Sequence, residues 1–204
     1  MPDTMQIFSI LFLMLGPFKI IGTFTMITAG ADPKLVSAIS NRAVLYASIA
    51  LVLAAVVGES VIMKFGIPVP VLALAAGIIL FLVALINVIN QYGLDEPPPV
   101  VPDPPTIKMA MSPLAFPTIV TPYGIATVIV LTAISPDLQG KVTVLVIVLI
   151  IMVINLILMM VNRYIYKVLA VCLPILGAVL GVIQVALGLK IIYNSLKLLL
   201  DLNQ

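Results

Sequence analysis

Residues 112–132 read SPLAFPTIVTPYGIATVIVLT, an apolar stretch that is interrupted by Pro113, Pro117 and Pro122. Proline lacks a backbone N–H and its ring clashes with the preceding helical turn, so a continuous helix is not expected here. Thr121 followed by Pro122 favours a helix start, with Thr as N-cap and Pro at the first helical position. Irregular backbone at membrane depth survives only where it is buried in protein or lines a cavity. The stretch therefore predicts a broken membrane-spanning helix, and a span merely kinked by proline is the alternative.

A second break is predicted near the N-terminus, where residues 15–24 read LGPFKIIGTF. The Pro-Phe pair in this stretch lies 105 residues before Pro122-Tyr123, and Gly16 takes the cap place of Thr121. Two interrupted spans at corresponding positions indicate a duplicated membrane unit.

The composition is that of an integral membrane protein. Of the 204 residues, 63% are hydrophobic and 9% are charged, whereas soluble domains carry about 25% charged residues. The formal net charge of +2 gives no reason to expect a nucleic-acid partner. We therefore predict a multi-pass protein of the cell membrane, with the lipid bilayer as its main partner.

The residue inventory argues against an enzyme. The chain has no His, which rules out Ser-His and Cys-His nucleophilic pairs and a His-ligated metal site. It has no G-x-x-x-x-G-K-[ST] loop, so it does not itself hydrolyse a nucleotide. We expect no catalytic residue, no cofactor and no metal.

Six apolar segments are long enough to cross a bilayer. They lie at about residues 5–28, 43–63, 69–90, 109–134, 142–161 and 169–193. Between the third and the fourth, residues 92–108 hold six prolines, which predicts an extended, semi-rigid linker. We expect a first three-helix repeat at residues 1–91 and a second at residues 109–204, and Gly77 matches Gly181 at a distance of 104 residues.

The odd number of spans in each repeat decides the predicted topology. A second copy that follows three crossings enters the membrane from the opposite side, so the two copies must be inverted. Inverted repeats with discontinuous helices are typical of secondary transporters, which bind their substrate near the bilayer midplane. The predicted fold is all-α, with six transmembrane helices in two inverted three-helix repeats and with the first and fourth helices broken.

The positive charges favour one orientation, because cytoplasmic loops carry an excess of Lys and Arg. One predicted side holds more of these residues than the other, which places both termini outside the cell. The richer side has Lys34, Arg42, Lys108, Arg163 and Lys167, and the other has Lys64, Lys141 and Lys197, with Lys190 near or within the last helix.

The candidate binding site is the pair of breaks. Each break starts a half-helix whose unpaired N–H groups and partial positive charge suit an anionic group such as a carboxylate. Glycines allow close backbone approach, threonines offer hydroxyls, and the two aromatic residues can close over a small ligand. The candidate substrate-binding residues are Gly16, Pro17, Phe18, Lys19, Thr121, Pro122, Tyr123, Gly124 and Thr127.

Lys19 lies about midway along the first segment, where a cation is costly in the membrane. Its charge could face the cavity and meet an anion, or take the place of a coupling cation. The alternative is that Lys19 extends along a tilted helix toward the membrane surface.

Other polar residues in the spans favour structural roles. Glu59 is expected to pair with Lys190, in preference to a role in proton coupling. Intramembrane amides usually hold helices together, which we expect of Asn87, Asn155 and Gln184. Small residues make a close-packing face on the sixth segment, for internal packing or, alternatively, for a homo-oligomer. They are Gly177, Gly181 and Gly188.

These motifs resemble those of the MarC family of membrane proteins, also called the neutral amino acid transporter family. Residues 112–128, SPLAFPTIVTPYGIATV, resemble the family pattern P-L-A-x-P-x-x-x-G-P-G-x-I-x-T-V. Residues 15–22, LGPFKIIG, resemble D-P-F-G-N-x-P. The chain departs from the pattern because Gly16 stands in place of Asp and Lys19 in place of Gly, while Thr121 and Tyr123 replace two glycines. The resemblance implies six spans and, in some members, uptake of small neutral amino acids coupled to an ion gradient.

The sequence thus predicts a secondary transporter for a small neutral amino acid or a similar zwitterion, coupled to a proton or a sodium ion or to neither. Two alternatives stay open: a non-transporting scaffold that binds partners through the proline-rich linker, and a passive channel. Saturable binding distinguishes a transporter from a scaffold, and saturable flux distinguishes it from a channel.

Overall fold

The computed structural model describes residues 3–16, 18–92, 104–135 and 137–201, with only the backbone described at residues 18, 19, 91, 92, 163, 165–174 and 176. The described chain is helical and has no strand. Its elements are α1 (Thr4–Leu15), α2 (Phe18–Ile27), α3 (Pro33–Lys64), α4 (Val69–Tyr92), η1 (Ile107–Ala110), η2 (Met111–Ile119), α5 (Pro122–Ala133) and α6 (Leu138–Asp201).

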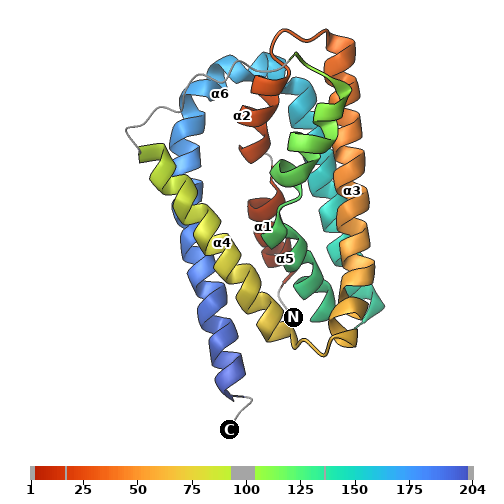
Figure 1. Ribbon diagram of the computed structural model, residues 1–204, viewed down its shortest axis with the longest axis vertical. Coiled ribbons are helices and arrows are strands. Elements are labelled where there is room, and N and C mark those ends of the chain that lie inside the picture. Colours follow the sequence, from red (N-terminus) through yellow and green to blue (C-terminus); the bar gives the residue numbers. More distant parts are fainter. Residues whose placement is uncertain (1–2, 17, 93–103, 136, 202–204) are drawn as a thin grey trace.

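The short helices lie at the centre and the long helices surround them (Figure 1). α3 stands on one side, and α4 with the last part of α6 stands on the other. α6 rises beside α3, bends at the top and descends next to α4, so both termini lie at the same end of the bundle. Among the described residues, five stretches are long and apolar enough to cross a membrane, if α1 and α2 are taken as one stretch and the two arms of α6 as two. The number is six if η1, η2 and α5 form one bent span. The prediction of an all-helical, multi-pass membrane protein is confirmed.

Two predicted boundaries are wrong. α3 begins at Pro33 after the N-cap Asp32, ten residues before the predicted start of the second segment. Residues 33–42, which mix polar and apolar side chains, belong to the helix because Pro suits its first turn and Ser40 turns inward, where its Oγ donates to the Val36 carbonyl at 2.9 Å. The predicted fifth and sixth segments are two arms of one helix, α6, which continues through residues 162–168 and ends at Asp201.

The predicted linker at residues 92–108 lies mostly outside the described residues, which resume at residue 104. Its last two residues already belong to the helical turn η1, and Tyr92 is the final residue of α4. The extended conformation predicted for this segment therefore does not hold at its two ends.

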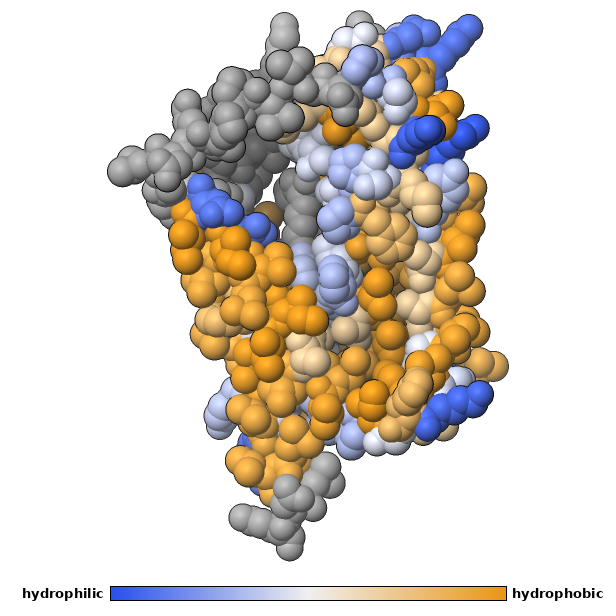
Figure 2. Space-filling model, in the orientation of Figure 1, coloured by the Kyte–Doolittle hydropathy of each residue, from blue (hydrophilic) through white to orange (hydrophobic). Residues whose placement is uncertain are grey.

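The hydrophobic core lies between the broken central helices and the inner faces of α3 and α6. Its fully buried side chains include Leu11, Ile39, Leu51, Leu114 and Ile151. The outer faces of the long helices are apolar too, with exposed side chains such as Leu53 on α3 and Ile86 on α4. Figure 2 shows this apolar surface along α4 and the lower part of α3. Apolar residues both inside and outside are what a bundle immersed in lipid requires.

Candidate functional site

The second break forms as the sequence predicts. Thr121 is the N-cap of α5 and its Oγ1 accepts a hydrogen bond from the Gly124 N–H at 3.1 Å, with Pro122 at the first helical position. Before it, the backbone of η2 leaves helical geometry at Ser112 and Phe116. The segment 107–119 and α5 meet at an angle of 61°. The proline-rich stretch is therefore a broken helix and not a kinked continuous one.

The first break separates α1 from α2. α1 ends at Leu15, Gly16 is extended with φ −75° and ψ 167°, and α2 begins at Phe18. A Cβ on Gly16 would overlap the Phe12 carbonyl oxygen, so this buried position requires glycine. Pro17 and the side chains of Phe18 and Lys19 lie outside the described residues, and the roles predicted for them stay predictions.

The structure brings the two breaks together. A Cβ on Gly124 would lie 2.7 Å from Leu15 Cδ2, so the start of α5 packs directly against the end of α1. Figure 1 shows this meeting point about halfway along the bundle. Residues more than a hundred positions apart in sequence therefore share one site in the interior.

The threonine hydroxyls at the second break are engaged within their own helix. Thr127 is buried and its Oγ1 donates to the Tyr123 carbonyl at 2.7 Å, while Thr121 serves as the cap. Tyr123 and Gly124 are buried and Pro122 is exposed. Both threonine hydroxyls thus make a bond within their own helix, and the prediction that they also bind a ligand stays a prediction.

Amides from α6 complete the first break. A helix end leaves carbonyls without intrahelical partners. Asn155 Nδ2 donates to the Leu15 carbonyl at 2.9 Å and Gln184 Nε2 donates to the Leu13 carbonyl at 3.0 Å. The predicted helix-joining role is confirmed for these two amides, whereas Asn87 is exposed on α4 and the prediction for it is wrong.

Asn162 is a further helix-joining amide of α6, away from the two breaks, that the sequence reasoning missed. It is buried, and its Nδ2 donates to Thr25 Oγ1 on α2 at 2.7 Å. Its spacing of seven residues from Asn155 was the available signal, because it places both amides on one face of α6. Both arms of the first broken span are therefore tied to the same helix face.

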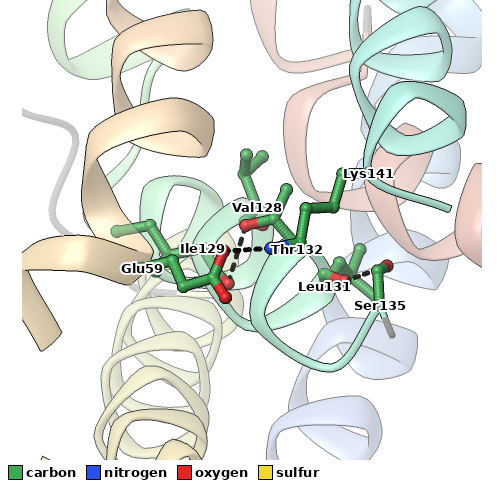
Figure 3. A network of polar contacts seen from close by, with 7 residues as sticks. All are labelled: Glu59, Val128, Ile129, Leu131, Thr132, Ser135 and Lys141. Atoms are coloured by element: carbon green, nitrogen blue, oxygen red, sulfur yellow. Dashed lines mark hydrogen bonds and ion pairs between the residues drawn. The ribbon is translucent and has the colours of Figure 1, made fainter. Parts of the chain in front are cut away.

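An ion pair links α3 to α6 near one end of the bundle. Figure 3 shows Lys141 of α6 reaching Glu59 of α3 beside the last turn of α5. The Nζ–Oε2 distance is 2.6 Å and the side chains are 34% and 28% exposed. The predicted pairing of Glu59 with Lys190 is wrong, since Lys190 lies exposed on the last arm of α6. Glu59 follows Gly58, which packs on Ile129 of α5, so α3 lies directly against α5 beside the ion pair.

The glycines of α6 serve internal packing. A Cβ on Gly181 would lie 2.7 Å from Val88 Cγ2, and one on Gly188 would lie 2.9 Å from the Phe81 backbone. Both contacts are to α4, so the preferred internal-packing prediction is confirmed for these two residues.

The broken helices reach the surface on one face. Figure 2 shows pale blue residues over the central broken helices, next to the orange surface of α4. In η2 and at the start of α5 the exposed residues include Ser112, Pro117 and Pro122. A less apolar surface at mid-height is the place where irregular backbone can meet water or a ligand.

The comparisons with known proteins concern the whole chain. Residues 1–200 match a family described as MarC family integral membrane protein. A UPF0056 membrane protein of Methanocaldococcus jannaschii is 28% identical over 156 residues, which cover 70% of this chain and 70% of that protein. No solved structure matches the chain.

Proposed function

The chain belongs to the MarC family of integral membrane proteins, and from this premise we propose that it is a secondary transporter of small neutral amino acids or similar zwitterions. The observation that carries the proposal is the contact between Leu15 and Gly124, which joins two broken spans halfway along the bundle. Discontinuous helices that meet near the midplane form substrate sites in secondary transporters. Since fold alone does not establish an activity, the proposal depends on this site.

A reciprocal pair of contacts supports the inverted repeat. Gly58 packs on Ile129, with a Cβ on the glycine 2.5 Å from Ile129 Cγ1. Asn162, which lies 104 residues after Gly58, bonds Thr25, which lies 104 residues before Ile129. A two-fold relation between equivalent units produces exchanged contacts of this kind.

A second pair of contacts, on α4 and α6, repeats the relation. A Cβ on Gly77 would lie 2.9 Å from Ile191 Cγ2 and 3.1 Å from Ile192 Cγ1, and one on Gly181 would lie 2.7 Å from Val88 Cγ2. The two glycines are 104 residues apart, and so are Val88 and Ile192. These pairs favour the division into repeats at residues 1–91 and 109–204 with six spans.

The helix ends supply a means of binding a zwitterion. The N-terminal ends of α2 and α5 carry partial positive charge and suit a carboxylate. The backbone of Lys19 belongs to the first turn of α2, and the contact of its ammonium with an anion stays part of the proposal. The C-terminal end of α1 at Leu15 carries partial negative charge and suits an ammonium group. Rocking of one repeat against the other would expose this site to each side in turn.

A proteoliposome uptake screen tests the proposal. We expect saturable uptake of at least one small neutral amino acid, measured with labelled substrates with and without a proton or sodium gradient. Uptake that rises linearly with concentration would indicate a passive channel. Neither uptake nor binding of any amino acid would contradict the proposal and favour the scaffold.

A further inference from the structure

Two buried side-chain oxygens have no hydrogen-bond partner within the described part of the chain. They are Oδ1 of Asn155 and Oδ1 of Asn162, in residues that are 0% and 4% exposed. A buried acceptor without a partner costs free energy, and native proteins satisfy nearly all such groups. An orphaned acceptor next to a candidate site therefore marks a place for a donor from outside the described residues.

The position of the Asn155 oxygen follows from the bond that the same amide makes. Its Nδ2 donates to the Leu15 carbonyl at 2.9 Å, and the reversed amide would place two oxygens face to face. Oδ1 is therefore held beside the last residue of α1, where the helix end carries partial negative charge. The side chain of Leu15 packs on Gly124, so the residue whose carbonyl Asn155 binds is the one that joins the two breaks.

The repeat relation shows that the break itself does not require this amide. The position 104 residues before Asn155 is Leu51, and the position 104 residues before Gln184 is Leu80. Both leucines are fully buried. Polar groups have thus been placed against the first broken span and not against the second, although each break leaves backbone groups to satisfy.

We propose that Asn155 Oδ1 is a substrate-binding group that accepts a hydrogen bond from the ammonium of the transported zwitterion. The inference rests on the proposed function and deepens it. The ammonium sits at the C-terminal end of α1, and the carboxylate of the same molecule sits at the N-terminal ends of α2 and α5. A hydrogen bond to a charged group in a buried site discriminates strongly against a ligand that lacks the donor.

The test compares ligands with and without the amine. The full-length protein is purified in detergent, and affinities for L-alanine, propionate and ethylamine are obtained from ligand-induced thermal stabilisation. We expect the wild type to bind L-alanine about 10- to 100-fold more tightly than propionate, the range for a hydrogen bond to a charged group. In Asn155→Leu this ratio falls to near unity and stabilisation by ethylamine is lost.

Asn162→Leu is the matched control. It removes a buried amide from the same face of α6, together with the hydrogen bond to Thr25. Thr25 lies ten residues after Leu15, so this amide is away from the first break. We expect it to keep the wild-type preference for L-alanine. Asn155→Asp keeps an acceptor oxygen and is expected to keep ethylamine binding, which covers the case in which Asn155→Leu fails to fold.

The outcomes separate the two claims. Binding of L-alanine with an unchanged preference over propionate in Asn155→Leu overturns the inference and leaves the transporter proposal standing. Binding of ethylamine that depends on Asn155, without binding or uptake of any amino acid, upholds the amine site and overturns the proposed function. Three further results overturn the inference. The first is an equal loss of the preference for L-alanine in Asn162→Leu, and the second is stabilisation of the wild type by sodium alone that Asn155→Leu abolishes. The third is that no probe binds.

Discussion

The ion pair between Glu59 and Lys141 provides a quantitative test of how the two halves of the chain are joined. The perturbation is a double-mutant cycle with Glu59→Gln, Lys141→Met and the double variant. Glu59 lies on α3 and Lys141 on α6, and their side-chain atoms meet at 2.6 Å. The cycle isolates the coupling between these two residues because each single change removes the charge without introducing a new one.

The expected magnitude follows from exposure. Fully exposed ion pairs contribute about 0.2–1 kcal/mol, whereas removing one partner of a buried pair costs about 3–5 kcal/mol. The side chains here are 34% and 28% exposed, between those limits. We therefore expect a coupling free energy of about 1–2 kcal/mol, which is roughly a 5- to 30-fold change in the unfolding equilibrium.

The assay is reversible denaturation of the purified protein in mixed micelles, followed by helical circular dichroism. Lys190→Met is the control, because Lys190 is exposed and the ion-pair partner of Glu59 is Lys141. We expect Lys190→Met to be additive with Glu59→Gln. Additivity of Lys141→Met with Glu59→Gln, or coupling of Glu59 to Lys190 instead, would refute the reasoning.

Three further predictions concern packing, charge and orientation. Gly58→Ala should destabilise the fold by about 1–3 kcal/mol through overpacking, because its Cβ would lie 2.5 Å from Ile129 Cγ1. In an Ile129→Ala background, which removes the clashing side-chain carbons, the same change should cost less in a denaturation assay, and an equal cost in both backgrounds would contradict the contact. Lys19→Met should fold at least as well as wild type, since a costly cation is removed, and should lose about 1–3 kcal/mol of substrate affinity. Equal ligand-induced thermal stabilisation of the two proteins would mean that Lys19 only extends to the membrane surface. A cysteine at the exposed Thr106, in a Cys172→Ala background, should not react with an impermeant thiol reagent added to intact cells, because the excess of Lys and Arg places the loop before η1 in the cytoplasm. Rapid labelling would show that the predicted orientation is wrong.

The sequence by itself determined the features that depend on a few neighbouring residues. The helix start at Thr121-Pro122 could be predicted because capping and the geometry of proline act over about one turn. The break after Leu15 was predicted by comparison with that motif, and the MarC resemblance came from the same residues. The membrane environment followed from composition alone.

Some boundaries could not be predicted because hydropathy reports where a chain enters lipid and not where a helix ends. Residues 33–42 hold five polar or charged side chains and yet are helical, since α3 begins before its continuous apolar part. The bend of α6 likewise keeps helical backbone where loss of apolar character indicated a loop.

Only the tertiary structure decided which distant residues meet. Glu59 had several lysines within reach on the same predicted side, and the packing of Gly58 on Ile129 selected Lys141. Asn155 read as a helix-joining amide, but its partner at Leu15, and its unpaired oxygen beside the breaks, depend on how α6 lies against α1. Capping and proline geometry act within one helical turn, whereas these contacts join residues 82 and 140 positions apart and are set by the packing of whole helices.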